Sequence, residues 1–241
     1  MDDIVDVNTL FGPLPQASND LTVESLLELM QHNGVGRACA LSTLGLLLDP
    51  TVGNAVTRAT CAENTALLPV ATFNPMMYFG DKEPLARLKA DGFCLVRFFP
   101  KHQGWPIEYA PFRALLNDLR ATGLPVIIGV SAPGDITVLE RVLDGFTAPV
   151  ILADIHTNML SESLIALREH ASWHLELSGL LAPGAIKAVV DGVGSERLLF
   201  GTNAPSFPIA SALDTLHFAG LTDVQRSQIL GANARRILSL S

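Results

Sequence analysis

The sequence predicts an α/β fold, in which residues 1–241 form a single domain, a (β/α)8 TIM barrel with an extra C-terminal helix. Short apolar runs alternate with longer amphipathic segments along all 241 residues. Strands that alternate with helices indicate a parallel sheet. Eight such units in a chain of this length fit a closed barrel.

The strands are expected at eight short apolar runs: Ile4–Asn8, Arg37–Ser42, Leu68–Asn74, Phe93–Phe99, Pro125–Val130, Val150–His156, His174–Ser178 and Arg197–Thr202. The helices are expected between them, near 22–32, 54–65, 82–90, 109–121, 136–144, 161–169, 183–193 and 208–219, with the extra helix at Asp223–Ser239.

Local signals support these boundaries. Thr22 and Ser25 precede apolar residues that recur at helical spacing, which predicts a helix start. Gly123-Leu124-Pro125 ends one helix and opens the next strand. Glycines stand where helices should stop before strands, a common position for this residue, at Gly34, Gly92, Gly145 and Gly194.

A doubly wound open sheet is the alternative fold. That fold would require a glycine-rich phosphate loop directly after the first strand. Here Asn8-Thr9-Leu10-Phe11-Gly12-Pro13 follows instead, and neither a dinucleotide fingerprint nor a P-loop occurs in the sequence. The sequence therefore favours the barrel.

Composition and charge exclude several classes of function. The chain is 49% hydrophobic and 17% charged, with a formal net charge of -8. Nucleic acids and anionic membranes are bound by basic patches, so neither is an expected partner. The N-terminus has no basic and apolar leader pattern, and no apolar run reaches the length of a membrane span. These features lead us to expect a soluble cytoplasmic protein; the sequence leaves open a homodimer.

Polar residues at the ends of the expected strands predict where chemistry takes place, because active sites of such barrels lie at the carboxyl ends of the strands. Asp6 with Asn8, Asp154 with His156, and Glu176 with Ser178 are two residues apart, so each pair is expected on a common face. Further polar groups at these ends are Ser42, Thr43, Asn74, Arg97, Lys101, His102 and Asn203. So many polar groups indicate a bound polar ligand.

Several segments resemble the amidohydrolase-related family of barrel hydrolases, whose second group includes decarboxylases of aromatic acids. Ile4–Gly12 is similar to the family's first strand, which ends in Asp-x-His-x-His. Leu198–Pro205 is similar to its last strand, and Ile229–Leu238 to its closing helix. Pro69–Pro75 and Gly123–Ile128 also resemble it, so the resemblance covers nearly the whole chain.

The chain departs from the family where that family binds a divalent metal, often zinc. Asn8 and Leu10 stand at the two first-strand histidines, Gly129 at the strand-5 histidine, Asp154 at the strand-6 histidine, and Asn203 at the last-strand aspartate. A neutral amide is a poor ligand and leucine is none. The usual zinc site is therefore not expected, and no cofactor is assigned.

A weakly bound divalent cation, zinc or manganese, remains open. It would use carboxylates at Asp154, Asp6 or Glu176, because harder cations accept such oxygens.

The residues chosen for chemistry each have a structural alternative. Asp154 and His156 are the expected proton-transfer pair, or else a carboxylate bound to loop backbone and a solvent-facing histidine. Arg97 is expected to bind a substrate carboxylate, or else a carboxylate of the chain such as Glu176 or Asp6.

The remaining candidates line the expected mouth. Asn8 and Asn203 are expected to hydrogen-bond a ligand, or else each other. His102 and Trp105 would wall a pocket, or else belong to a surface loop.

Two classes of function follow from these residues. The first is a hydrolase or decarboxylase-like enzyme that acts on a small organic acid, lactone or related carbonyl compound. The second is a catalytically inactive relative that binds a small molecule or a protein partner at the barrel mouth. The resemblance favours the enzyme, and the replaced metal-ligand positions favour the inactive relative.

Overall fold

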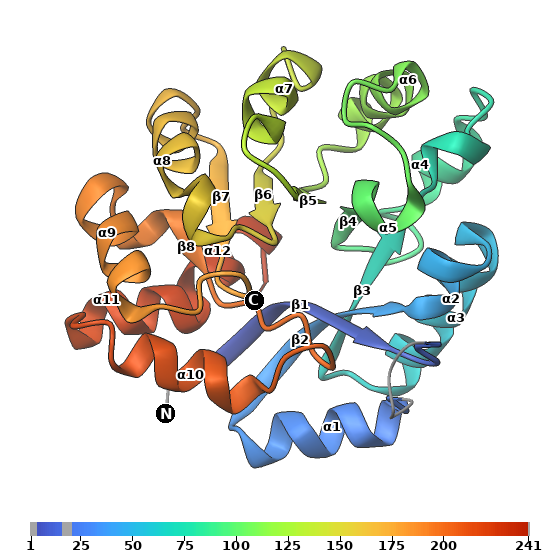
Figure 1. Ribbon diagram of the computed structural model, residues 1–241. Helices are drawn as coiled ribbons and strands as arrows, with labels where there is room; N and C mark the ends of the chain where they lie inside the picture. The colour runs from blue at the N-terminus through green and yellow to red at the C-terminus, as the bar shows by residue number, and fades with distance from the viewer. Residues whose placement is uncertain (1–3, 16–20, 241) are drawn as a thin grey trace.

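The protein is a barrel of eight parallel strands that lie in chain order, from β1 to β8 (Figure 1). The computed structural model describes residues 4–15 and 21–240; the first residues of the N-terminal segment considered for a leader lie outside this part. The strands are β1 (Ile4–Phe11), β2 (Val35–Ser42), β3 (Leu67–Thr72), β4 (Leu95–Phe98), β5 (Val126–Gly129), β6 (Val150–Ala153), β7 (Trp173–Glu176) and β8 (Leu198–Leu199).

Backbone hydrogen bonds between the first and last strand regions close the barrel. The Val7 N–H donates to the Phe200 carbonyl at 3.0 Å, and the Leu10 N–H donates to the Ala204 carbonyl at 2.8 Å. The predicted (β/α)8 fold is therefore confirmed, and the open sheet is excluded.

All eight predicted connecting helices are present and surround the barrel (Figure 1). They are α1 (Val23–His32), α3 (Pro50–Glu63), α4 (Glu83–Arg87), α6 (Ala110–Leu119), α7 (Asp135–Val142), α8 (Leu160–Glu169), α9 (Pro183–Val193) and α10 (Ile209–His217). Two short helices were not predicted, α2 (Thr43–Leu47) and α5 (Pro100–Gln103). Each is about one turn long, too short for an apolar period to identify it.

The predicted C-terminal helix is present in three consecutive segments: α11 (Asp223–Ser227), a π-helical turn η5 (Gln228–Ala232) and α12 (Asn233–Leu238). Ile237 and Leu238 of α12 pack in the same apolar cluster as Val5, the second residue of β1. The last helix therefore covers the end of the barrel where the strands start.

Two apolar clusters lie on the two sides of the strands. The inner cluster fills the barrel with alternate strand residues such as Leu95 of β4 and Ile151 of β6. The outer cluster joins the intervening residues, such as Val96 and Leu152, to the helices. This alternation places the next inner positions, Arg97 among them, at the carboxyl end of the barrel.

β1 departs from simple alternation. Val7 and Leu10, which are three residues apart, both belong to the inner cluster. The pairing of β1 with β2 shifts register between Asp6 and Thr9, which is the behaviour of a β-bulge. The bulge brings the Asn8 side chain next to Gly201, beyond the end of β8.

Six of the eight strands end earlier than predicted, and two of them end three residues earlier. The expected strand Val150–His156 stops at Ala153, and the expected strand Arg197–Thr202 is reduced to Leu198–Leu199. Asp154 and Asn203 have φ angles of 62° and 52°, in the left-handed region that extended strands do not use. The alternation that would place Asp154 and His156 on one strand face therefore does not hold, and that prediction is wrong.

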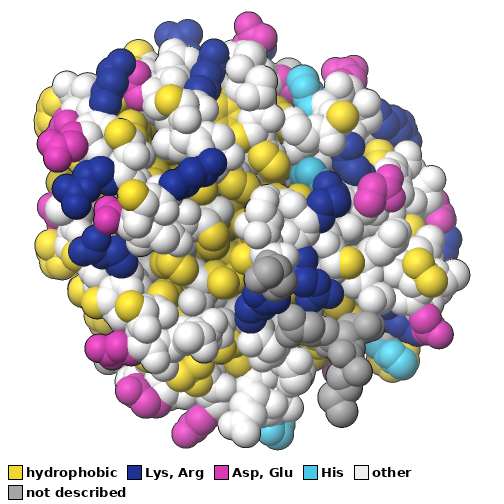
Figure 2. All heavy atoms as spheres, turned by 180° about the vertical axis from the view of Figure 1, so that it is seen from behind, with side chains coloured by type: hydrophobic (Ala, Val, Ile, Leu, Met, Phe, Trp, Pro, Cys, Tyr) yellow, Lys and Arg dark blue, Asp and Glu magenta, His cyan; other side chains and the backbone are white. Residues whose placement is uncertain are grey.

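No helix in the described part of the chain has the length and apolar character needed to cross a membrane. Seen from behind, apolar side chains reach the surface in a band across the middle of the molecule, with lysine and arginine side chains on both sides (Figure 2). The homodimer stays a prediction.

Candidate active site at the barrel mouth

Arg97 of β4 is the central cation of the barrel mouth. Its side chain is buried, and its Nη2 donates a hydrogen bond to Asn203 Oδ1 at 3.2 Å. Its Cζ lies 4.3 Å from the centre of the Phe99 ring, a cation–π contact. Its Nη1 is buried without a hydrogen-bond partner among the described residues. Because arginine N–H groups only donate, Nη1 is aimed at an acceptor that the chain does not supply.

Three carboxylates act on this guanidinium. Burial lowers the pKa of Arg97, and Asp154, Glu176 and Asp6 each oppose that shift, Asp154 most strongly. These residues lie on or beside β6, β7 and β1, far apart in sequence. The barrel thus brings three carboxylates from separate parts of the sequence around one arginine.

Glu176 is fully buried and held in place by its neighbours. Its carboxylate accepts hydrogen bonds from the Ser178 N–H at 2.9 Å, the Ser178 hydroxyl at 2.5 Å and the Asp154 N–H at 3.3 Å. Burial raises the pKa of Glu176, the Asp154 charge adds to that, and Ser178 and Arg97 oppose it. The pairing of Glu176 with Ser178 therefore orients the carboxylate.

Asp6 is also fully buried. It accepts hydrogen bonds from the Asn8 N–H at 3.0 Å, the Thr202 N–H at 3.2 Å and the Thr202 hydroxyl at 2.6 Å. Burial outweighs these contacts and raises the pKa of Asp6 to about 7. Its contacts tie β1 to the segment after β8, which indicates a structural role for this residue.

Asn8 is buried with no partner for its side chain. Neither Nδ2 nor Oδ1 has a hydrogen-bond partner within the described residues, although the side chain is only 1% exposed. A buried polar group without a partner costs about 1–3 kcal/mol. Such a group is best explained by a ligand that supplies both an acceptor and a donor.

Two glycines make room for the carboxylates. A Cβ at Gly129 would lie 2.6 Å from Asp154 Oδ2, and a Cβ at Gly201 would lie 2.3 Å from Glu176 Oε2 and 3.2 Å from the Asn8 Cβ. Sequence analysis noted Gly129 only as a missing ligand and overlooked Gly201. A glycine within a strand or just beyond its end often marks a close approach of another group, and that signal was available.

The two candidate histidines have different surroundings. His102, on α5, packs edge-on against Phe99 with ring centres 6.1 Å apart. Partial burial lowers the pKa of His102, and the nearby Asp154 carboxylate opposes this. His156 is exposed at the start of a 3₁₀ turn, η3 (Thr157–Met159), and no contact joins it to the described residues of the mouth. The imidazole brought beside Asp154 is thus that of His102.

Trp105 lies in the outer apolar cluster, away from solvent. Its ring is 4.7 Å from that of Phe112, and its Nε1 donates to Gln103 Oε1 at 2.9 Å. The structure therefore packs Trp105 against helix α6 rather than in an ordinary surface loop.

The donor set at the mouth does not fit a divalent metal. Within residues 4–15 and 21–240, three ligand atoms of His, Cys, Asp or Glu lie within 4.8 Å of one another only at Glu140, Glu169 and His170. Asp6, Asp154 and Glu176 do not form such a group, and a guanidinium lies among them.

The Glu140, Glu169 and His170 group lies at the opposite end of the barrel, where α7 and α8 finish. His170 Nε2 is 3.3 Å from Glu140 Oε1, so the imidazole already has a carboxylate partner.

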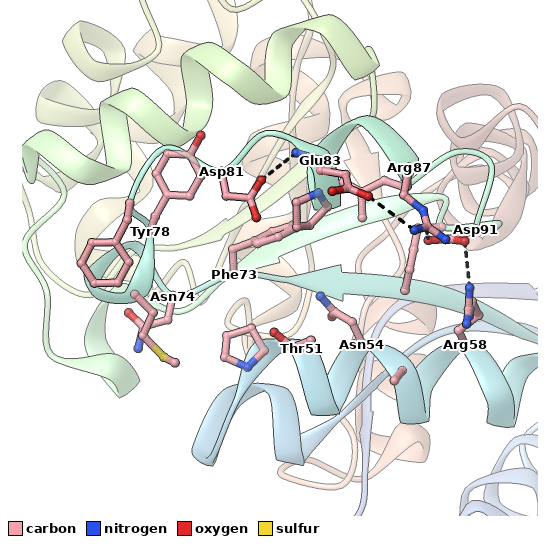
Figure 3. Close-up of a pocket in the computed structure, with 17 residues that line it drawn as sticks. Thr51, Asn54, Arg58, Phe73, Asn74, Tyr78, Asp81, Glu83, Arg87 and Asp91 are labelled. Atoms are coloured by element: carbon pink, nitrogen blue, oxygen red, sulfur yellow. Dashed lines mark hydrogen bonds and ion pairs between the residues drawn. The ribbon is translucent and has the colours of Figure 1, made fainter.

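A cavity of about 630 Å³ lies outside the barrel, between α3 and α4 (Figure 3). Aromatic side chains from the end of β3 onward and charged residues of the two helices line it (Figure 3). Four of its five charged residues are paired with one another: Arg58 with Asp91 at 2.8 Å, and Arg87 with both Glu83 at 3.8 Å and Asp91 at 4.0 Å. Of the polar strand-end residues marked in the sequence, Asn74 lines this cavity, whereas none of the residues chosen for proton transfer, ligand binding or metal binding does.

Comparison with protein families gives one match. A family model described as amidohydrolase matches residues 54–240, from within α3 to the penultimate residue of the chain. The matched segment contains Arg97, Asp154, Glu176 and Asn203, whereas Asn8 and Asp6 precede it. A comparison with curated protein sequences gave no match.

Solved structures with the same fold include a 2,6-dihydroxybenzoate decarboxylase from Rhizobium, with 16% identity, a TM-score of 0.80, and 100% of this chain and 99% of that chain covered. A Pseudomonas putida protein assigned as a 2-pyrone-4,6-dicarboxylic acid hydrolase has 18% identity and a TM-score of 0.79, covering 100% and 99%.

A dihydroxybenzoic acid decarboxylase from Polaromonas sp. JS666, with bound manganese and the inhibitor 2-nitroresorcinol, has 16% identity and a TM-score of 0.77, covering 100% and 98%. At these identities the structures establish the fold alone.

Proposed function

The chain belongs to the amidohydrolase family, and on this premise we propose that it is an enzyme that hydrolyses or decarboxylates a small organic acid, lactone or related carbonyl compound. The substrate would bind at the barrel mouth. Two proteins of the same fold support the substrate class, since one is a 2,6-dihydroxybenzoate decarboxylase and the other is assigned as a 2-pyrone-4,6-dicarboxylic acid hydrolase.

The observation that carries the proposal is the pair of buried, unpartnered groups at the mouth, Arg97 Nη1 and the Asn8 amide. A carboxylate oxygen would satisfy the Arg97 N–H with a charge-assisted hydrogen bond. The Asn8 amide would donate to a second oxygen and accept from a hydroxyl group. A small hydroxylated carboxylic acid offers all of these groups.

Asp154 is the proposed proton-transfer group. Its carboxylate accepts no hydrogen bond from the described residues, in contrast to those of Asp6 and Glu176, so it is free to face a substrate. In hydrolysis, Asp154 would accept a proton from water as the water oxygen bonds to the carbonyl carbon, and then return it to the leaving group. In decarboxylation, the carbon–carbon bond would break, CO₂ would leave, and an acid would protonate the remaining carbon.

Two histidines could assist Asp154. His102 is the one whose pKa responds to the Asp154 charge. His156 remains the choice made from the sequence, and it would act from the solvent side. Separate substitutions His102→Gln and His156→Gln would assign this role.

The experiment is a turnover assay on hydroxylated benzoic acids and on lactones of small dicarboxylic acids, with detection of CO₂ and of the ring-opened acid. Asp154→Asn should abolish turnover while ligand binding persists, and Arg97→Lys should weaken binding. Arg141→Lys is the matched control, because Arg141 is exposed and paired with Glu108 on the outer surface.

An inactive ligand-binding relative is the second candidate, favoured by the neutral residues Asn8, Leu10 and Asn203 at the mouth. Binding of a carboxylic acid that depends on Arg97, with no turnover of any compound in the panel, would support that alternative and contradict the enzyme.

A further inference from the structure

The Polaromonas relative binds manganese, whereas the mouth of this barrel contains an arginine among its carboxylates. We propose that the guanidinium of Arg97 is the fixed cation of this site, so that the chain binds its small carboxylate ligand without a divalent metal ion. This inference rests on the proposed function for the place of the ligand.

The first support is the position of Arg97. It lies on the inner face of β4 and is only 4% exposed, so its charge stays inside the barrel. Phe99 and Asn203 hold the guanidinium from two sides, through the ring contact at 4.3 Å and the hydrogen bond at 3.2 Å. A cation fixed by two partners does not leave the mouth to make room for a metal ion.

The second support is the state of the surrounding oxygens. Asp6 and Glu176 are occupied by hydrogen bonds from Thr202 and Ser178. Asp154 remains as a single carboxylate beside Arg97, and Asn8 supplies a neutral amide. Divalent cations such as Mn²⁺ favour several anionic oxygens, which this set does not bring together.

The third support is the type of unpartnered atom. Arg97 Nη1 can only donate, and Asn8 offers an NH2 group that donates and a carbonyl oxygen that accepts. N–H donors cannot coordinate a metal, but they fit the oxygens of a carboxylate. The unsatisfied nitrogens of Arg97 and Asn8 therefore call for an oxyanion, and the Asn8 carbonyl oxygen calls for a hydroxyl donor.

The test is a calorimetric titration of Mn²⁺ into the full chain, with elemental analysis after desalting. Glu140→Gln is the background variant, because it removes one ligand of the separate Glu140, Glu169 and His170 group. We expect the Glu140→Gln variant to retain no stoichiometric Mn²⁺ after desalting. The inference would be overturned if Glu140→Gln retained one equivalent of Mn²⁺ per chain and the double variant Glu140→Gln/Asp154→Asn lost it.

A second measurement uses the hole left by Arg97→Ala. Guanidinium ion at millimolar concentration should fill it and raise the melting temperature of Arg97→Ala by about 4 °C. The wild type and Arg141→Ala should show no such rise, and equal shifts in all three proteins would contradict the inference. Should Arg97→Ala not fold, Arg97→Lys replaces it in the Mn²⁺ titration, where a retained cation should still exclude the metal.

The outcomes separate this inference from the proposed function. If the chain binds a carboxylate without metal but turns over no compound, the proposed enzymatic function is contradicted and the proposal that Arg97 is the fixed cation stands. Turnover that requires added Mn²⁺ contradicts the fixed cation and leaves the enzyme in place.

Discussion

The barrel mouth and the outer cavity between α3 and α4 distribute their polar groups in opposite ways. In the outer cavity, Arg58, Arg87 and Asp91 are partly exposed and paired with one another (Figure 3). At the mouth, Arg97 and Asn8 are almost fully buried, and atoms of both lack a partner.

This difference shows that the size of a cavity does not identify the site. Paired charges near water gain little from a ligand, because water and their partners already satisfy them. A buried donor without a partner gains the full value of the hydrogen bond that a ligand supplies. The following predictions test whether the mouth, and not the outer cavity, is the functional region.

The largest effect is expected for Asp154→Asn. An amide cannot accept the proton, so kcat should fall by about 10²–10⁴-fold, the usual contribution of a positioned acid or base. The Michaelis constant should change little, because Arg97 and Asn8 remain. Steady-state kinetics on a substrate from the panel measure both values, and an unchanged kcat would remove Asp154 from the mechanism.

The next effect concerns the pH dependence of stability. Asp6 has an ordinary pKa of 3.8 when the chain is unfolded and a pKa of about 7 in the barrel. Between these values the folded chain holds a proton that the unfolded chain has released, so stability should fall as pH rises from about 4 to 7. A pKa shift of about three units corresponds to a loss of at most about 4 kcal/mol of unfolding free energy over this pH range.

Asp6→Asn cannot titrate and should lose this part of the slope. Urea unfolding of wild type and Asp6→Asn at several pH values between 4 and 8 measures the difference. Identical slopes for the two proteins would show that Asp6 does not carry the effect.

Arg97→Lys tests the ligand side of the mouth. A lysine keeps the charge but loses the forked donors, so the affinity for a carboxylate ligand should fall by about 10–100-fold. Calorimetric titration of the ligand measures the loss, with Arg141→Lys as the control. Unchanged affinity would place the carboxylate elsewhere, for instance in the outer cavity.

Gly201→Ala tests the space beside Glu176. The added methyl would meet Glu176 Oε2 at 2.3 Å and should cost about 1–3 kcal/mol of unfolding free energy. Gly184→Ala is the matched control, since nothing lies within 4 Å of its Cβ position at the start of α9. Equal stability of the two variants by denaturant unfolding would show that the mouth tolerates a side chain there.

The smallest effect is expected in the outer cavity. Arg58→Ala removes the 2.8 Å ion pair with Asp91. Both side chains of this pair are partly exposed, so the free energy of unfolding should fall by less than about 1 kcal/mol. Turnover should remain at the wild-type level. A loss of ligand binding in this variant would contradict the site at the mouth and place the ligand in the outer cavity.

Much of the fold was predictable from local patterns. The β6 run Val150–Ala153 is apolar and short, and α6 has apolar residues at helical spacing, so both elements were found within a few residues. Strand ends were less accurate, as at Asp154, because a left-handed backbone there depends on what surrounds the residue.

The site was predictable as a list of residues but not as an arrangement. The sequence marked Arg97, Asp154 and Glu176 as polar groups at strand ends, and it also marked His156, which the structure leaves exposed. Sequence spacing gives no information on which of two histidines meets a carboxylate from another strand. The role of Gly201 depends in the same way on the Glu176 carboxylate of a neighbouring strand.

The sequence by itself determined the barrel and the family, because periodicity and residue type are local properties. The replacement of metal-ligand residues by Asn8, Leu10 and Asn203 stays a prediction. Only the tertiary structure decided that Arg97 lies among three carboxylates and that the Asn8 amide is buried without a partner. Burial and hydrogen bonding depend on contacts between strands far apart in the chain, and those contacts exist only once the barrel has closed.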